Sequence, residues 1–208
     1  MLRIPHRRER FHFSKSARSG APGAVGLLKD ERGAALLEFA ITLPLLVVFV
    51  VGIYDFSGAF NQKQKIEQAA QEGAIVAGAQ PMSDIATSNG NPNSLQPVVT
   101  AVVNSLAGSG VLSPGACPPP FPATAQAGLA WTYTISGCSG GYPGDNLVIA
   151  INRGWVSALG PPLAVGTVVT VTYPYHWRFN SVIQLLFPGA GYAAKTYLSE
   201  SATVYNQM

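Results

Sequence analysis

The stretch that decides the fold runs from Phe39 to Tyr54 and reads FAITLPLLVVFVVGIY, sixteen residues without a charged side chain. At 1.5 Å per residue, a helix of this length covers about 24 Å, slightly less than the roughly 30 Å hydrocarbon core of a bilayer. The apolar residues at 34–37 and 56–60 extend the run, so that Glu38 and Asp55 would lie near the two bilayer interfaces. We therefore expect a transmembrane helix over residues 34–60.

Charge is distributed unevenly on the two sides of this segment. Residues 1–33 hold eight Lys or Arg and three acidic residues, a net charge of +5, whereas the remaining 175 residues carry −2. Because positive charges beside a membrane-spanning helix stay in the cytoplasm, the basic arm predicts a cytoplasmic N-terminus and an extracytoplasmic C-terminal part. A basic arm could also bind nucleic acid. The apolar segment directly after it favours the lipid bilayer as partner, and we expect no nucleic acid.

Composition agrees with this placement. Charged residues make up only 11% of the chain, less than half of the roughly 25% found in an average soluble domain. Low charge with ordinary apolar content is typical of a membrane or extracytoplasmic protein.

Two other interpretations of the apolar segment stay open at this point. A core helix of a soluble protein would need a partner segment of comparable hydropathy, and the sequence has none. A secretory signal peptide would explain the basic arm and the apolar core, and Ser57-Gly58-Ala59 has the small residues required for cleavage before Phe60. Its basic region would be 38 residues long, however, and Glu38 and Pro44 are unusual in such a peptide.

Glu38 is the unusual residue of the segment. A carboxylate at the edge of the hydrocarbon costs a few kcal/mol unless it is neutralised, which makes Glu38 a candidate functional residue. It lies five residues after Gly33, so that cleavage after Gly33 would leave Ala34 as the new N-terminus, one helical turn from Glu38. The new ammonium group and the carboxylate could pair within one chain or with a neighbouring copy.

Several stretches form a combined pattern: ERGAALLEFA at 31–40, Pro44 inside the apolar run, GIYDF at 52–56 and AAQEGA at 69–74, with VTVTYPY at 169–175 as a weaker continuation. In these residues the chain resembles the TadE-like family, pseudopilins of the tight-adherence (Flp) pilus system. Two places depart from the family pattern. Ile75 stands where a basic residue is common, and the chain ends in YNQM at 205–208 instead of in charged residues.

The resemblance implies a structural and assembly protein of a type IV pilus rather than an enzyme, with no cofactor. It implies that a prepilin peptidase removes the basic cytoplasmic leader 1–33 between Gly33 and Ala34. It assigns Glu38, Phe39 and Pro44 to helix packing during assembly. As partners it implies other pilins or pseudopilins and the pilus assembly platform, with the protein held in the inner (cytoplasmic) membrane by a single pass.

The residues after the membrane segment predict a helical stalk over 61–80 that ends at Pro81. Small and apolar residues recur there at three- and four-residue steps: Ile66, Ala69, Ala70, Gly73, Ala74 and Ala77. This narrow face could pack on the chain's own globular part or on another helix. Lys63 and Glu67 have the spacing of an ion pair along the helix.

Residues 81–208 predict an extracytoplasmic α+β domain. A polar linker over 83–97 leads to a short amphipathic helix over 95–106, and 108–128 is expected to be loop. Strands are predicted over 129–136, 145–153 and 167–177, with 195–205 as a fourth strand or an irregular edge. The expected fold is a pilin-like architecture, in which a long N-terminal helix precedes a small antiparallel sheet of three or four strands and a short helix. Alternating aromatic residues in the strands could form core or a binding surface: Trp131, Tyr133, Tyr173, Tyr175 and Trp177.

Cys117 and Cys138 are the only cysteines, 21 residues apart. Both lie outside the membrane by the topology argument, where disulfides form. A disulfide closing this loop would stabilise the domain by about 3 kcal/mol. The alternative is two free buried thiols, and since no Cys/His cluster accompanies them, we expect no metal site.

A hydrolase is the alternative function. Gly137-Cys138-Ser139-Gly140-Gly141 matches the G-x-S-x-G pattern of a serine nucleophile, with Asp145 and His176 following in the order of that fold. The pattern requires a helix directly after the serine, whereas GGYPG at 140–144 favours a turn. A secreted or membrane-anchored hydrolase using Ser139 is therefore the second hypothesis.

Overall fold

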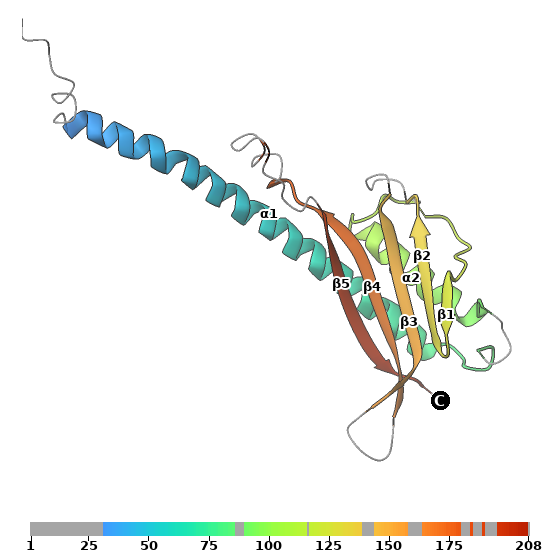
Figure 1. Cartoon of the computed structure of the whole chain (residues 1–208). Helices are drawn as coiled ribbons and strands as arrows, with labels where there is room; N and C mark the ends of the chain where they lie inside the picture. Colours follow the sequence, from blue (N-terminus) through green and yellow to red (C-terminus); the bar gives the residue numbers. More distant parts are fainter. Residues whose placement is uncertain are drawn as a thin grey trace, which may run out of the picture. The chain divides into compact units, whose positions relative to one another are not determined.

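The computed structural model describes residues 31–85, 90–115, 117–138, 144–157, 164–179, 184, 189 and 195–207. Its helices are α1 (Glu31–Ala79), the 3-10 helix η2 (Asn93–Leu95) and α2 (Gln96–Gly108). Its strands are β1 (Ala125–Ala127), β2 (Ala130–Ser136), β3 (Asn146–Val156), β4 (Val165–His176) and β5 (Lys195–Tyr205). The fold is the α+β architecture expected, with a long apolar N-terminal helix, an antiparallel sheet and a short helix (Figure 1). The basic arm, apart from its last residues, lies outside the described residues.

The chain divides into two compact units, Met1–Val47 and Val48–Met208, and α1 contributes to both. In the first unit, every described side chain of the helix from Gly33 to Val47 is exposed. Pro44 lies inside the helix and supplies no N–H to its ladder. The Thr42 hydroxyl donates a hydrogen bond to the carbonyl oxygen of Phe39 at 3.2 Å, so that this polar group is satisfied within the helix.

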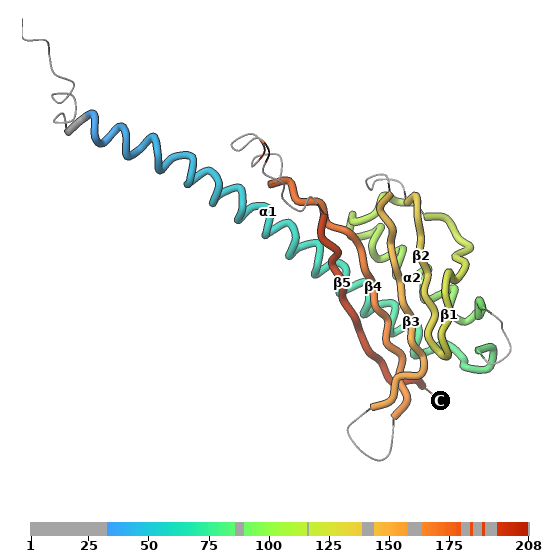
Figure 2. The backbone as a smooth tube through the Cα atoms, in the orientation of Figure 1, coloured from blue at the N-terminus to red at the C-terminus, as the bar shows by residue number. Residues whose placement is uncertain are grey.

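In the second unit, the five strands lie in the order β1-β2-β3-β4-β5, and all neighbours are antiparallel (Figure 2). The register places Trp131 opposite Ile151, and Ile151 opposite Val169. These side chains are buried, because successive residues of a strand point to opposite faces of the sheet. The core lies between this inner face and two helices, namely α2 and the part of α1 that belongs to the same unit.

The described strands number five, where three or four were expected. The additional strand is β1, which pairs with β2 inside the region predicted as loop. It has only three residues, all exposed, so that no alternation of buried side chains marks it in the sequence. Residues 195–205 form the regular edge strand β5 rather than an irregular edge. The predicted turn at 140–144 lies mostly outside the described residues.

The small-residue face of α1 packs on the chain's own domain. Its apolar members are all buried: Ile66, Ala69, Ala70, Ala74 and Ala77. A Cβ atom on Gly73 would lie 2.5 Å from Cγ2 of Val102 in α2 and 3.3 Å from Cγ1 of Val169 in β4. Glycine at this position therefore lets α1 approach both elements more closely than any larger residue would. Of the two partners considered for this face, the structure shows the chain's own domain.

The C-terminal end of α1 is held by an arginine from β3. Arg153 is fully buried, and its guanidinium donates hydrogen bonds to the carbonyl oxygens of Gln80 at 2.8 Å and Pro81 at 3.2 Å. A cation at this end of a helix also interacts favourably with the helix dipole. Burial lowers the pKa of Arg153, and the negative charge of Asp84 opposes that shift.

Two side-chain pairings were predicted, the disulfide from the location of both cysteines outside the membrane and the ion pair of Lys63 from its spacing, and the second is wrong. Cys117 and Cys138 form the expected disulfide, which links the segment before β1 to the end of β2. Lys63, however, pairs with Glu200 of β5 at 3.1 Å rather than with Glu67. Glu200 lies in register with Val171, on the inner face of the edge strand, and the contact with Lys63 neutralises its charge there.

Candidate functional site

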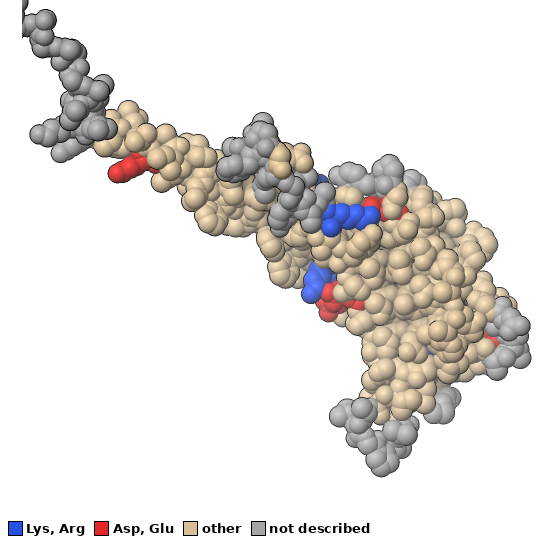
Figure 3. All heavy atoms as spheres, in the orientation of Figure 1, with Lys and Arg blue, Asp and Glu red and all other residues tan. Residues whose placement is uncertain are grey.

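The first half of α1 is an exposed apolar helix. Between Gly33 and Tyr54 the only charged residue is Glu38. Figure 3 shows an acidic side chain on this otherwise uncharged part of the helix. The most apolar 18 residues have a mean hydropathy of 2.6, and none of them is buried. The core helix of a soluble protein would bury most of such a stretch against other elements. The helix is therefore long and apolar enough to span a membrane.

The residues proposed from the resemblance all lie on this half of the helix. Gly33 and Ala34 are in its first turns, where backbone N–H groups lack intrahelical partners. Glu38 follows Ala34 by four residues, so that the two lie one turn apart on the same face. Glu38, Phe39 and Pro44 are exposed, which leaves them available to a neighbouring helix.

A second group of polar residues lies where α1 meets the end of β4. Asp55, the residue directly after the apolar run, is only 2% exposed. Its Oδ1 accepts a hydrogen bond from the Tyr175 hydroxyl at 2.9 Å, and its Oδ2 accepts one from the backbone N–H of Phe179 at 2.7 Å. Burial, together with the neighbouring carboxylate of Asp55, raises the pKa of Tyr175 to about 12. The sequence placed Asp55 only at the bilayer edge, whereas the structure makes it the first buried contact between α1 and the sheet.

A third carboxylate joins the adjacent strand ends. Asp145 precedes β3, and its two oxygens contact His176 Nε2 at 2.7 Å and Lys195 Nζ at 2.8 Å. Burial would raise the pKa of Asp145, but the hydrogen bonds and charges of Lys195 and His176 outweigh it and hold that pKa below its usual value. The same hydrogen bond raises the pKa of Lys195. The cluster ties the end of β4 to the start of β5.

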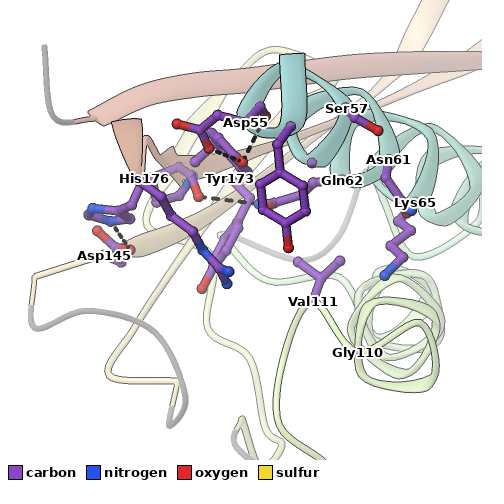
Figure 4. A pocket seen from close by; sticks show the side chains of 15 residues that line it. Asp55, Ser57, Asn61, Gln62, Lys65, Gly110, Val111, Asp145, Tyr173 and His176 are labelled. Atoms are coloured by element: carbon purple, nitrogen blue, oxygen red, sulfur yellow. Dashed lines mark hydrogen bonds and ion pairs between the residues drawn. The ribbon is translucent and has the colours of Figure 1, made fainter. Parts of the chain in front are cut away.

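These groups surround a cavity of about 480 Å³ between α1, the loop after α2 and the end of β4 (Figure 4). Gln62 lies on its wall and donates a hydrogen bond to the carbonyl oxygen of Pro174 at 3.3 Å. Lys65 and Arg178 also line it, and neither has a hydrogen-bond or ion-pair partner among the described residues. Sequence reasoning identified neither cation, because their proximity depends on the packing of a helix against a strand more than a hundred residues away.

One contact in the structure fits the hydrolase hypothesis. Asp145 and His176 are hydrogen-bonded, as a catalytic pair would be, but Lys195 occupies the other oxygen of the same carboxylate. Ser139 lies outside the described residues. The alternating aromatic residues were expected to form either core or a binding surface. Trp131, Tyr133 and Tyr173 are buried in the core. Tyr175 and Trp177 are half-buried beside the cavity, with ring centroids 5.1 Å apart.

In the part of the chain that the structure describes, no group of three or more His, Cys, Asp or Glu residues could hold a metal ion. In the comparison with known protein families, residues 33–74 match the family described as TadE-like protein. No curated protein matches the chain. No solved structure matches it either.

Proposed function

We propose, from the premise that residues 33–74 carry a TadE-like segment, that this protein is a membrane-anchored minor pseudopilin required for assembly of a tight-adherence type IV pilus. The family match and the unburied apolar helix fit a pilus-related membrane protein. The observation that supports the finer role is the position of Glu38, the one acid in the apolar stretch, a single helical turn after Ala34. The protein acts by packing rather than by catalysis.

Processing is the first step of this proposal. A prepilin peptidase on the inner membrane cuts the bond between Gly33 and Ala34 and removes the basic leader. The bond lies in the first turns of α1, where fewer backbone hydrogen bonds must open before a peptidase can bind an extended substrate. Cleavage creates an ammonium group at Ala34 that can pair with Glu38 of the same or a neighbouring copy.

After cleavage, residues 34–60 hold the protein in the inner membrane, with Asp55 and the residues after it at the membrane surface, where Asp55 contacts the domain. Residues 81–208 form the extracytoplasmic domain, with 61–80 as the stalk. The partners are the prepilin peptidase, other pilins or pseudopilins and the assembly platform. Phe39 and Pro44 shape the exposed helix surface on which these contacts form. Because the stalk face is already occupied by the chain's own domain, subunit packing uses the half of α1 that precedes Asp55.

The N-terminus of the protein extracted from membranes tests processing directly. N-terminal sequencing or intact mass should show a chain that begins at Ala34. A chain that begins at Phe60 would instead demonstrate secretion through a signal peptide. An uncut chain would show simple anchoring, and either result would contradict processing after Gly33.

The substitution Glu38→Ala tests the role of the carboxylate. We expect pilus assembly to be lost while the thermal unfolding of the domain is unchanged, because Glu38 is exposed and belongs to the unit Met1–Val47, which precedes the domain in the chain. Glu67→Ala is the matched control, since Glu67 is an exposed acid of the same helix that accepts only a long hydrogen bond, 3.5 Å, from Gln71. Normal pilus numbers in Glu38→Ala would remove the role assigned to Glu38.

The hydrolase using Ser139 remains the second candidate, supported by the contact of Asp145 with His176. It predicts that a serine-reactive phosphonate probe labels the protein and that Ser139→Ala abolishes the labelling. The pseudopilin proposal predicts no labelling and normal piliation in the same variant.

A further inference from the structure

The cavity beside Asp55 is lined by two positively charged side chains. Lys65 lies on α1 and Arg178 follows β4, so that the two cations line the cavity from different elements. Neither is paired within the described part of the chain. Unpaired cations on the two sides of a concave surface are a favourable arrangement for an anionic group.

The acids that line the same cavity do not cancel these charges by direct contact. Asp55 is buried, and both of its carboxylate oxygens accept hydrogen bonds from Tyr175 and Phe179. Asp145 is buried as well, and its oxygens contact His176 and Lys195. Counting Lys195 with Asp145, and with His176 neutral, the groups around the cavity carry a net charge of +1. Figure 4 shows the carboxylate of Asp145 beside His176 and that of Asp55 between α1 and the end of β4.

The position of the cavity along α1 indicates the source of an anion. Tyr54, the last residue of the apolar run, is 67% exposed and lines the cavity. Lys65 lies eleven residues further, about 16 Å along the helix axis. Helical side chains tilt toward the helix N-terminus, and a lysine stem is long, so that an ammonium group at this position can reach back along the helix toward the apolar run.

Aromatic side chains surround the same level of the helix. Phe56 is exposed and contacts Trp177, with ring centroids 5.4 Å apart. Trp177 in turn donates a hydrogen bond to the Thr196 hydroxyl at 2.7 Å. Tryptophan and tyrosine are enriched where a membrane protein passes the headgroup layer. Apolar helix, aromatic residues and unpaired cations therefore follow one another in the order expected of a lipid interface.

We propose that this cavity binds the phosphate of an anionic phospholipid in the leaflet around the C-terminal end of the apolar helix, with Arg178 and Lys65 as its cationic contacts. Its volume, about 480 Å³, lies within the roughly 300–1,000 Å³ of small-ligand sites. The bound lipid fixes the base of the domain at the membrane surface. The inference rests on the membrane anchorage in the proposed function, and not on cleavage after Gly33 or on a role in pili.

The test uses the full chain in nanodiscs of phosphatidylcholine that contain a minor fraction of phosphatidylglycerol. Native mass spectrometry of the released protein measures which lipid stays bound. We expect the wild type to retain phosphatidylglycerol preferentially, and Arg178→Gln and Lys65→Gln each to weaken retention roughly fivefold, from the contribution of one basic residue near an anionic surface. Lys63→Gln is the matched control, because Lys63 lies two residues from Lys65 but pairs with Glu200 outside the cavity.

Three outcomes would overturn the proposal. One is equal retention of both lipids by the wild type. Another is a loss in Lys63→Gln as large as in Lys65→Gln, which would indicate a general charge effect. The third is a wild type that binds inorganic phosphate in a titration while showing no preference among lipids, which would assign the cavity to a free anion. A chain that fails to enter the nanodisc would contradict the membrane anchorage instead, so the two failures are distinguishable.

Discussion

The two halves of α1 differ in side-chain size and in what covers them. From Gly33 to Tyr54 the helix carries large apolar residues, and all but a few are exposed. From Asp55 to Ala79 its inward face is built from small residues, which are buried against α2 and β4. One continuous helix therefore has two environments, and the change falls at Asp55.

This difference shows how side-chain volume separates packing against lipid from packing against protein. Large exposed aliphatic side chains would be costly in water, since each buried CH₂ group is worth about 0.8 kcal/mol, and they favour an environment of lipid chains. Alanine and glycine bury little area themselves but bring backbones close together, which increases dispersion contacts between the elements. The predictions below test each half separately.

The largest effect is expected from charges placed in the apolar half. Leu45→Arg combined with Leu46→Arg places two guanidinium groups near the middle of the stretch, where each costs about 2.5–3.5 kcal/mol in a bilayer. We expect the protein to lose membrane integration, measured as the fraction that stays in the pellet after an alkaline carbonate wash. Gln64→Arg combined with Gln71→Arg, at exposed positions of the second half, should leave that fraction unchanged. A double leucine variant that remains fully integrated would contradict the assignment of the apolar half to lipid.

The next effect concerns the end of the second half. Arg153→Leu removes two hydrogen bonds from a buried cation to the carbonyl groups of Gln80 and Pro81, directly after α1, each worth about 1.5–3 kcal/mol. We expect the free energy of unfolding to fall by about 3 kcal/mol in urea titrations of the detergent-solubilised protein. Arg178→Leu is the control, because Arg178 is exposed and has no hydrogen-bond or ion-pair partner in the described ranges. Equal stability of the two variants would show that Arg153 does not hold the helix end.

The elements predicted well from sequence are those with strong periodicity. The Ala/Gly steps of α1 and the alternation in β2 and β4 each repeat with the period of their element, because one face is buried, and the apolar run stands out by its length without a charge. Position 73 illustrates what the periodicity does not show, namely which neighbours a buried residue contacts. The sequence marks Gly73 as part of a small-residue face, but only the structure shows that Val102 and Val169 require it to be small.

The cavity and its cations could not be predicted, because they depend on contacts between distant parts of the chain. Asp55 and Tyr175 are 120 residues apart, and Arg153 and Gln80 are 73 apart. No local pattern encodes such pairs. Lys63 shows that a local pattern can also predict the wrong partner. Its spacing predicted a pair with Glu67, whereas Lys63 pairs with Glu200 of β5 in the fold.

A smaller loss of stability is expected from replacing Gly73 than from the changes above, and replacing Gly52 of the same helix provides the comparison. Gly73→Ala introduces a methyl group 2.5 Å from Val102, and overpacking of this kind costs about 1–3 kcal/mol. Gly52→Ala meets nothing within 4 Å, so it should leave the domain unchanged or slightly stabilise the helix. Thermal unfolding of both variants measures the difference. Equal melting temperatures would show that α1 does not approach α2 as closely as the structure indicates.

The smallest expected effect is a change in the stability of the domain with pH, to which the apolar half of α1 does not contribute. Asp145 has a pKa below its usual value of 3.8 because Lys195 and His176 donate hydrogen bonds to it, and Tyr173 is the other titratable group beside it. A carboxylate whose pKa is lower in the folded state stabilises the fold above its unfolded pKa, and this contribution disappears as the pH falls through the folded value.

The melting temperature of the wild type should therefore decline below about pH 4, whereas Asp145→Asn should melt lower at neutral pH and decline less in acid. Glu72→Gln, a half-buried helix position whose carboxylate accepts a hydrogen bond from Gln68, should follow the wild-type curve. If the melting temperature declined equally in acid for Asp145→Asn and for the wild type, contacts other than those of Asp145 would hold the strand ends together.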